Sequence, residues 1–419
     1  MSHLDLPMSD EQMERIATIL PTPFYLYDEK AIIQNAKNFV EAFSWAPNFK
    51  NYYAVKACPT PGVLQPLFDL GFGADCSSLP ELMLSEQGGV SGENIMMTSN
   101  DTPPEEFIKA YRLGAIINLD DISHIKSMED AIGCVPDTIC FRYNPGPERT
   151  GNAIIGNPIE AKYGLTTDQL FEAYTIMKKK GCKKFGLHTM VASNELNPDY
   201  IIETAHMLFS LCVKIKEVCG VDISFVDLGG GVGIPYKVDD KEMDIAYISD
   251  GIKKLYHSII VPAGLDPLSI AFELGRYITG PYGYLVSTVR HVTRKYKDYV
   301  GMDATMADLM RPALYGAYHH ISVVGKEQLP HDHIYDVTGS LCENNDKFAI
   351  DRHLPKIEEG DILVFHDTGA HGHSMGFNYN AKLRPAEYVL KENGKVEMIR
   401  RAQTIQDYFE TLHFDPVEV

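Results

Sequence analysis

Short apolar runs alternate with longer helical patterns from residue 51 to about residue 276. The runs have the length and apolar character of buried β-strands, and turn residues separate them from the helical stretches. They are YYAVK (52–56), FGADC (72–76), NIMMTS (94–99), AIINLD (115–120), TICFRYN (138–144), KFGLHTM (184–190), ISFVDLGGG (223–231) and SIAFELGR (269–276). Eight strands that alternate with helices predict an α/β fold, and they favour a (β/α)8 TIM-type barrel over an open, doubly wound sheet.

The clearest helical pattern is the stretch NPDYIIETAHMLFSLCVKIKEVCG at 197–220. Its apolar residues recur at the spacing of one helix face. Asn197 and Pro198 are typical of an N-cap and a first helical position, and Gly220 is typical of a C-terminal stop. The sequence therefore predicts a helix bounded by these residues.

After about residue 285 the chain changes to alternating apolar and polar residues with Gly and Asp turns. LVSTVRHVTRKYKDYVGMD, HIYDVTGSLC and DILVFHDTG show this pattern, which is typical of an antiparallel β-domain. PFYLYDEKAIIQNAKNFVEAF (23–43) predicts a strand and then a helix, which either lead into the barrel or join the β-domain. We expect an N-terminal segment (1–45) that partly joins the β-domain, a barrel (46–285) and a C-terminal antiparallel β-domain (286–419).

Composition and charge narrow the functional classes. The 419-residue chain is 45% hydrophobic with a formal net charge of −19, so nucleic acid and anionic membranes are not expected partners. No apolar run has the length of a membrane span, and the start MSHLDLPMSDEQMERI lacks signal-peptide features. The eight cysteines form no CxxC pair, which argues against a metal site or a disulfide scaffold and for the reducing cytoplasm.

Unusual polar residues fall at the C-terminal ends of the predicted barrel strands, where barrel enzymes carry their chemistry. They are Lys56, Asp75, Arg142, Asn144, His188, Gly229, Gly230, Gly231, Glu273 and Arg276. Burial at a dry strand end is expected to depress the pKa of Lys56, and a neutral amine can form a Schiff base with an aldehyde.

The other polar groups complete a cofactor pattern. Three glycines after a strand let backbone amides cradle a phosphate, and a carboxylate such as Glu273 can hold a pyridine nitrogen protonated. Together with Lys56 these groups indicate a pyridoxal 5'-phosphate site. A tight turn alone at the glycines, and a salt bridge between Glu273 and Arg276, are the structural alternatives.

Several longer stretches resemble one family of enzymes. They are YYAVKAC, DLGGGVGIPY, FELGR, DLMRPALYGAYHHI, GSLCENND, GDILVFHDTGAHGHSMGFNYN and RPAE. From PTPFYLYD to RRAQTIQDYF the chain resembles the barrel-type (fold type III) pyridoxal-phosphate decarboxylases, and among them the diaminopimelate decarboxylases. The resemblance implies decarboxylation of meso-2,6-diaminopimelate to L-lysine and CO2, a step of lysine biosynthesis, by an obligate homodimer.

The resemblance also implies roles for individual residues. Lys56 is expected to bind the cofactor aldehyde and Glu273 its pyridine nitrogen, and Cys342 is expected to return a proton after CO2 leaves. The further cofactor-binding residues are Asp75, His188, Ser193, Gly229, Gly230, Gly231, Gly275, Arg276 and His371. The substrate-binding residues are Arg276, Arg311, Tyr315, Glu343 and His371, and the LCE stretch is expected to enter the partner subunit's active site.

Charge bears on the choice of substrate. Arg276 and Arg311 suit a distal carboxylate, and Glu343 suits the amine beside it, as in meso-diaminopimelate. Arg311 as a helix cap and Tyr315 as a core residue are the structural alternatives. The functional alternatives are a decarboxylase of the same fold acting on carboxynorspermidine, another diamino acid or a D-amino acid, a racemase, and a dimeric binding protein without a cofactor.

Four positions depart from the family pattern. Leu274 stands in place of a proline, Ala192 in place of a glycine, and His371 in place of a tyrosine, which is expected to make activity more pH-sensitive. Met190 aligns with a histidine that stacks on the cofactor ring. Either its thioether packs on the ring, or His188, two residues earlier, is the equivalent residue.

Overall fold

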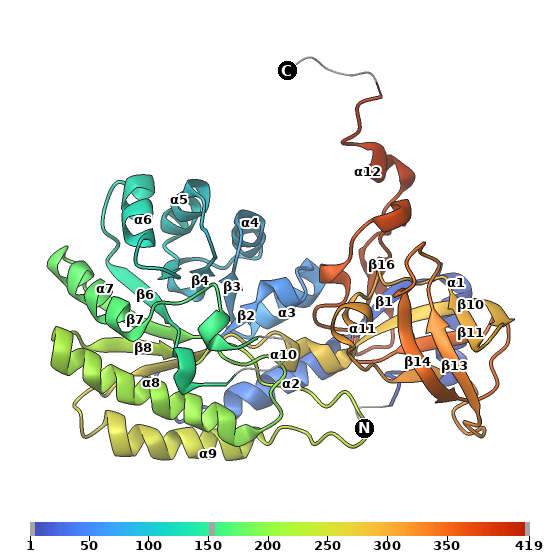
Figure 1. Cartoon of the computed structure of the whole chain (residues 1–419), viewed down its shortest axis with the longest axis horizontal. Helices are drawn as coiled ribbons and strands as arrows, with labels where there is room; N and C mark the ends of the chain where they lie inside the picture. The colour runs from blue at the N-terminus through green and yellow to red at the C-terminus, as the bar shows by residue number, and fades with distance from the viewer. Residues whose placement is uncertain (1–4, 151–155, 415–419) are drawn as a thin grey trace. The chain divides into compact units, whose positions relative to one another are not determined.

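The computed structural model describes residues 5–150 and 156–414, and the chain divides into two compact units (Figure 1). The first unit contains Ile33–Pro235 and Asp240–Ile278. The second contains the described chain up to Ile32, the short stretch Tyr236–Asp239, and the described chain from Thr279 onward. Among the described helices, none is both long enough and apolar enough to cross a membrane.

Eight parallel strands close into a barrel in the first unit. They are β2 (Lys50–Ala54), β3 (Gly73–Cys76), β4 (Ile95–Thr98), β5 (Ile116–Leu119), β6 (Thr138–Tyr143), β7 (Lys184–Thr189), β8 (Ile223–Asp227) and β9 (Ser269–Phe272). Each strand falls within or overlaps one of the eight apolar runs, and β2 pairs with β9 to close the ring. The predicted TIM-type barrel is confirmed.

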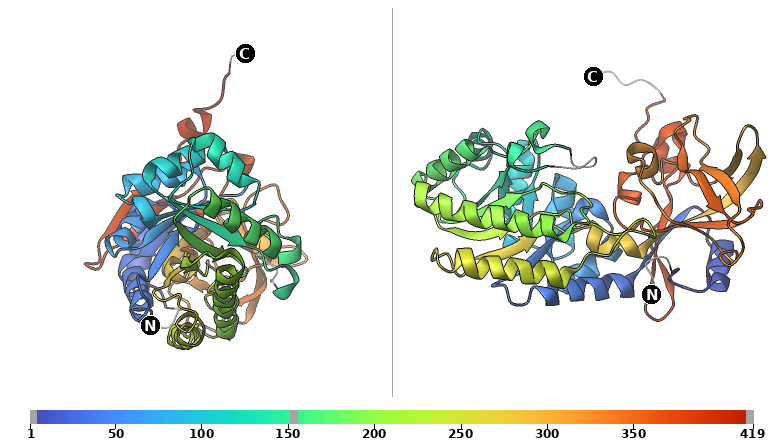
Figure 2. Two further views of the ribbon diagram at one scale, coloured as in Figure 1. Left: turned by 90° about the vertical axis from the view of Figure 1, so that its left-hand side faces the viewer. Right: turned by 60° about the horizontal axis from the view of Figure 1, so that its bottom comes forward.

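Helices surround the barrel strands, as the left view of Figure 2 shows. They are α2 (Glu29–Ala42), α3 (Pro61–Asp69), α4 (Leu79–Gln87), α5 (Pro104–Leu113), α6 (His124–Ile132), α7 (Thr167–Lys179), α8 (Pro198–Cys219) and α9 (Ile245–Leu255). The predicted bounds of α8 are confirmed. The side chain of Asn197 accepts from the amide of Asp199, and Gly220 ends the helix with a left-handed φ of 61°.

An apolar layer fills the interior of the barrel. Tyr52, Met96, Ile116, Cys140, Phe225 and Ala271 come from six different strands and pack together. At the corresponding position of β7 stands Gly186, where an added Cβ would lie 1.9 Å from the ring of Phe225. The missing side chain therefore makes room for Phe225, and the layer closes the barrel below its carboxyl ends.

The second unit is built on a nine-stranded sheet with the path β14-β13-β11-β10-β1-β16-β17, to which β15 and β12 are added through β10. The strands are β1 (Phe24–Asp28), β10 (Gly283–Arg294), β11 (Asp298–Met302), β12 (Ile321–Val323), β13 (His333–Thr338), β14 (Lys347–Leu354), β15 (Ile362–Phe365), β16 (Ala386–Leu390) and β17 (Val396–Arg400). The helices with most residues in this unit are α1 (Asp10–Ile19), α11 (Arg311–Tyr315) and α12 (Ile405–Phe409), while α10 (Arg276–Thr279) spans the boundary.

The sheet is mixed, and in this respect the antiparallel prediction is wrong. β1 runs parallel to β16, and β11 runs parallel to β13, while the other pairings in the sheet are antiparallel. Alternating apolar and polar residues identify a half-buried strand but carry no information about the direction of its neighbour. β1 brings Phe24 and Leu26 into a core with Tyr284, Val286 and other apolar residues.

A buried histidine is expected to make the stability of the second unit depend on pH. Burial lowers the pKa of His373 to about 4. The positive charges of Arg384 and Arg400 act in the same direction, while the negative charge of Glu387 opposes them. The unfolded chain therefore binds more protons than the folded one between about pH 6.5 and pH 4. Acidification from about pH 7.5 to about pH 5 is expected to cost roughly 2 kcal/mol through this group.

Hydrogen exchange of the β1 and β16 amides at the two pH values measures this effect. His373→Gln is expected to remove most of the pH dependence, because glutamine does not titrate. An equal loss of protection in the variant and the wild type on acidification would assign the effect to other groups.

Candidate active site

A polar layer lies two residues beyond the apolar layer along the strands. It consists of Thr98, Asn118, Arg142, His188, Asp227 and Glu273, all of them buried. Because side chains two residues apart point to the same face of a strand, this layer also faces the barrel interior, at the carboxyl ends. Sequence reasoning identified His188 and Glu273 but missed Asn118 and Asp227, which the same two-residue offset could have found.

Lys56 follows β2 in a single helical turn, and its Nζ lies 2.9 Å from Oδ2 of Asp75 on β3. The expectation of an uncharged lysine is wrong. Burial lowers the pKa of this amine, but the charges of Asp75 and Glu273 outweigh it and hold the pKa above its ordinary value. The prediction from sequence assumed a dry strand end and did not include the two carboxylate neighbours. In the structure 48% of the Lys56 side chain is exposed, so the strand end is not dry.

Asp75 is the ion-pair partner of this amine. Burial and the negative charge of Glu273 raise its pKa to about 7, against the opposing effect of Lys56. Its second oxygen, Oδ1, is buried without a hydrogen-bond partner. Because the pKa of Lys56 is the higher of the two, the amine keeps its proton near neutral pH and Asp75 acts as its ion-pair partner.

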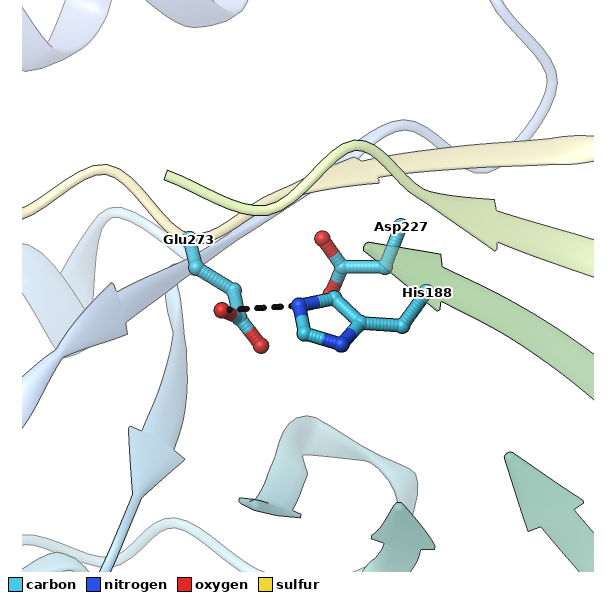
Figure 3. A group of neighbouring side chains, drawn as sticks. All are labelled: His188, Asp227 and Glu273. Carbon is cyan, nitrogen blue, oxygen red and sulfur yellow. Dashed lines mark hydrogen bonds and ion pairs between the residues drawn. The ribbon is translucent and has the colours of Figure 1, made fainter. Parts of the chain in front are cut away.

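Figure 3 shows the group formed by His188, Asp227 and Glu273. His188 Nε2 lies 3.2 Å from Glu273 Oε2, while Glu273 Oε1 is buried without a hydrogen-bond partner. Burial raises the pKa of Glu273, but the opposite effects of His188, Lys56 and Arg142 are larger. The pKa of Glu273 is therefore lowered overall, and its carboxylate is ionised.

Asp227 is the neutral member of the group. Burial and the charge of Glu273 raise the pKa of this carboxyl well above its usual range. Potential ligand atoms of Asp227, His188 and Glu273 lie within 4.8 Å of one another, a spacing that could also hold a cation. We interpret the group as a charge cluster, because the imidazole of His188 is already hydrogen-bonded to Glu273.

A glycine turn follows β8. Asp227 Oδ1 accepts from the amide of Gly229 at 2.8 Å, and Gly229 and Gly231 have left-handed φ values of 70° and 104°. An added Cβ would lie 2.1 Å from the carbonyl oxygen of Thr189 at Gly229, and 2.9 Å from that of Glu273 at Gly230. The turn therefore requires glycine for its conformation and for the close approach of neighbouring backbone.

Met190 contacts this turn directly. The amide of Gly230 donates to its Sδ at 3.3 Å. His188 instead lies inside the barrel beside Glu273, so the two side chains occupy different places. The thioether borders the turn at Gly230, while the imidazole of His188 lies beside Gly229, where an added Cβ would be 3.4 Å from its Nε2.

The turn after β9 explains why leucine replaces proline at position 274. The amide of Leu274 donates to Asn51 Oδ1 at 3.0 Å, and its carbonyl accepts from Asn51 Nδ2 at 3.2 Å. Proline has no amide hydrogen and could make only one of these bonds. At Gly275 an added Cβ would lie 2.6 Å from that of Ala57, so this glycine lets the Lys56 segment approach the turn.

These residues fit pyridoxal phosphate. Lys56 offers an amine for the aldehyde, the turn at Gly229–Gly231 offers backbone at a strand end for the phosphate, and Glu273 Oε1 is an open buried acceptor for a protonated ring nitrogen. Arg276 opens α10 next to the same turn, and Ser193 is half-buried after β7. The sequence-predicted residues of the first unit therefore gather at one end of one barrel.

The other predicted site residues belong to the second unit. Arg311 and Tyr315 are the two ends of α11, Arg311 being 2% and Tyr315 42% exposed. Arg311 Nη1 donates to the hydroxyl of Tyr236 at 2.9 Å and to His319 Nε2 at 3.1 Å. Hydrogen bonding, not capping, therefore occupies this guanidinium.

The loop between β13 and β14 carries Cys342 and Glu343, both exposed. The amide of Cys342 donates to Asn380 Oδ1 at 2.7 Å, which fixes the loop and presents the thiol at the surface of the unit. His371 is half-buried in the loop after β15, with a left-handed φ of 55°.

Comparisons with known proteins show the family to which the chain is similar. Residues 29–280 match the family model described as pyridoxal-dependent decarboxylase, pyridoxal binding domain. Protein TabA of Pseudomonas amygdali pv. tabaci is 40% identical, with 99% of this chain and 98% of that protein aligned. Diaminopimelate decarboxylase of Methanothermobacter thermautotrophicus is 33% identical over 92% of this chain and 90% of its own.

Solved structures of diaminopimelate decarboxylases are also similar to this chain. The crystal structure of diaminopimelate decarboxylase from M. jannaschii matches with a TM-score of 0.89 at 30% identity, covering 96% of this chain and 94% of that one. The Helicobacter pylori enzyme complexed with L-lysine matches with a TM-score of 0.85 at 29% identity, covering 95% and 98%.

Proposed function

This chain belongs to the pyridoxal-dependent decarboxylase family, and from that premise we propose that its substrate is meso-2,6-diaminopimelate and its product L-lysine. The cofactor is pyridoxal phosphate and the reaction a decarboxylation of an amino acid. The observation that carries the choice of substrate is Arg311, a buried guanidinium held in one orientation by Tyr236 and His319. An oriented arginine suits a planar carboxylate, which L-lysine and L-ornithine lack at their distal ends.

The residues of the barrel prepare the reaction. Pyridoxal phosphate supplies an aldehyde for the substrate amine and a ring that withdraws electrons from the bond to the departing carboxylate. Asp75 Oδ2 lies 2.9 Å from Nζ of Lys56 and holds this amine as an ion-pair partner, and the amine acts as a nucleophile once it has lost its proton. Glu273 remains ionised and offers Oε1 to the ring nitrogen, which keeps that nitrogen protonated.

The exposed loop of the second unit suggests a second subunit. We propose that the protein is a homodimer in which Cys342 returns the proton after CO2 leaves and Glu343 binds the distal amine. Both side chains are exposed, and the bond from the amide of Cys342 to Asn380 holds the loop outward. An exposed, ordered thiol is available to a partner chain.

A panel of substrates tests the proposed function. CO2 release should be measured from meso-diaminopimelate, L-lysine and L-ornithine with the holoenzyme. We expect kcat/KM for the first to exceed that of the others by at least about 10²-fold, because only a substrate with a distal carboxylate can form a charge pair with the oriented guanidinium of Arg311. Equal or faster turnover of L-lysine or L-ornithine would contradict this substrate.

A second candidate is the same reaction on carboxynorspermidine or another diamino acid. It is supported by the 40% identity to TabA, which exceeds the 33% to the diaminopimelate decarboxylase of M. thermautotrophicus. Met190 and His371, which differ from the family pattern, also favour an altered pocket. Carboxynorspermidine and related diamino acids belong in the same panel, and preference for one of them would select this candidate.

A further inference from the structure

We propose that Asn118 is a positioning residue that fixes the tautomer of His188 and thereby directs Glu273 toward the cofactor. The inference rests on the role of Glu273 given under the proposed function. It starts from a chain of hydrogen bonds that crosses the barrel from β4 to the end of β9.

The chain of hydrogen bonds contains four buried side chains. Asn118 Nδ2 donates to Thr98 Oγ1 at 3.0 Å and lies 2.9 Å from His188 Nδ1. His188 Nε2 lies 3.2 Å from Glu273 Oε2. Thr98 pairs with Asn118 in register across β4 and β5, so the barrel itself sets the first of these contacts.

The amide of Asn118 decides where the imidazole proton lies. The structure turns Nδ2 of Asn118 toward the ring and leaves Oδ1 buried without a hydrogen-bond partner, and in this orientation Nδ1 of His188 accepts and carries no proton. The proton of a neutral imidazole then sits on Nε2, which donates to Glu273. If the amide were turned around, its oxygen would face Nδ1 of His188, and that nitrogen would carry the proton. In a neutral ring Nε2 would then present a lone pair to the carboxylate of Glu273, which is unfavourable. Only a charged ring would carry a proton on both nitrogens.

The tautomer determines what Glu273 can do. With a neutral His188, Glu273 keeps its full negative charge, and its Oε2 is committed to one hydrogen bond. Oε1 is the remaining acceptor, and it is buried without a hydrogen-bond partner. A buried acceptor left unpaired is costly, so a protonated ring nitrogen that pairs with Oε1 is bound more tightly. An imidazolium at position 188 would instead neutralise Glu273 and weaken its hold on that nitrogen.

Asp227, the third member of the group in Figure 3, does not compete for the imidazole proton. Its Oδ1 accepts from the amide of Gly229 at 2.8 Å, and its Oδ2 has no hydrogen-bond partner. His188 and Asp227 face each other in register on β7 and β8. Glu273 is therefore the carboxylate to which the hydrogen bond of His188 is made.

The first test is the tautomer itself, measured by ¹⁵N NMR of the full-length holoenzyme labelled at histidine. The signals of His188 are assigned by their loss in His188→Gln. We expect a protonated Nε2 and an unprotonated Nδ1 in the wild type. A protonated Nδ1 in the wild type would overturn the proposal.

The second test reverses the polarity of the amide. Asn118→Asp has the same size but can only accept when ionised, so it is expected to move a proton to Nδ1 of His188. Pyridoxal phosphate is then expected to bind roughly ten- to a hundredfold more weakly, as the loss of one charge-assisted hydrogen bond predicts. An unchanged tautomer with unchanged cofactor affinity would also overturn the proposal.

Asn51→Asp is the matched control. Asn51 is likewise buried in the barrel, but it bonds to the backbone of Leu274 and not to an imidazole. The control should leave the tautomer of His188 unchanged, and a shift equal to that of Asn118→Asp would show a general effect of buried charge and contradict the proposal. None of these readouts uses a substrate, so they stand apart from failure of the substrate panel.

Discussion

Lys56→Ala is expected to lower kcat/KM for decarboxylation by at least about 10⁴-fold, because it removes the amine that bonds to the cofactor. The structure adds that this amine forms an ion pair with Asp75 at 2.9 Å before it bonds to the cofactor, and that nearby carboxylates hold its pKa above the ordinary value. Removing the cation takes away the ion-pair partner of Asp75, so the pKa of Asp75 is expected to rise further. Single-turnover assays with the cofactor-loaded variant measure the loss.

Lys56→Arg separates charge from chemistry. The guanidinium can keep the ion pair with Asp75, but it stays protonated and cannot bond to an aldehyde. We expect the same loss of activity as in Lys56→Ala, with a melting temperature closer to that of the wild type. Normal turnover in either variant would exclude Lys56 as the cofactor lysine.

The same variant tests whether the site is shared between subunits. Mixed with Cys342→Ala under conditions that exchange subunits, Lys56→Ala should recover part of the wild-type activity, because a mixed dimer contains one site with both native residues. Recovery without subunit exchange, or none after proven exchange, would contradict a shared site.

Most of the barrel and its main candidate residues could be predicted from the sequence, because burial on both faces gives parallel strands an unmistakable apolar run. YYAVK and SIAFELGR identify β2 and β9 without any knowledge that these strands are neighbours. Asn197 and Gly220 could be predicted as the ends of α8, because helix caps depend on residues that are adjacent in the sequence.

What the sequence could not supply depends on contacts between distant residues. The charge of Lys56 is set by Asp75 and Glu273, which lie on other strands, so a strand-end argument alone gave the wrong sign. The role of Leu274 depends on Asn51, a residue distant in sequence whose side chain bonds to both the backbone amide and the backbone carbonyl of Leu274. The parallel pairing of β1 with β16 likewise joins opposite ends of the chain.

Arg311→Met is expected to raise KM for the substrate with a distal carboxylate and to lower kcat/KM by roughly 10²- to 10³-fold, a cost of about 3 to 4 kcal/mol for a lost buried charge pair. The argument rests on orientation. His319 Nδ1 donates to the carbonyl of His366 at 2.8 Å, so its Nε2 is a lone pair that must accept from Arg311. The hydroxyl of Tyr236 also accepts a hydrogen bond from Nη1 of Arg311, and the two bonds together fix the plane of the guanidinium.

Arg352→Met provides the matched control, because Arg352 Nη1 donates to the backbone carbonyl of His319 at 2.9 Å and so touches the same histidine from another direction. It removes an arginine of the same unit while leaving the side-chain bond between His319 and Arg311 in place. We expect a small change in stability and less than about a threefold change in kcat/KM, as for other changes away from a site. If Arg311→Met lost activity equally on amino acids with and without a distal carboxylate, the arginine would be a structural residue, because a carboxylate anchor must discriminate between them.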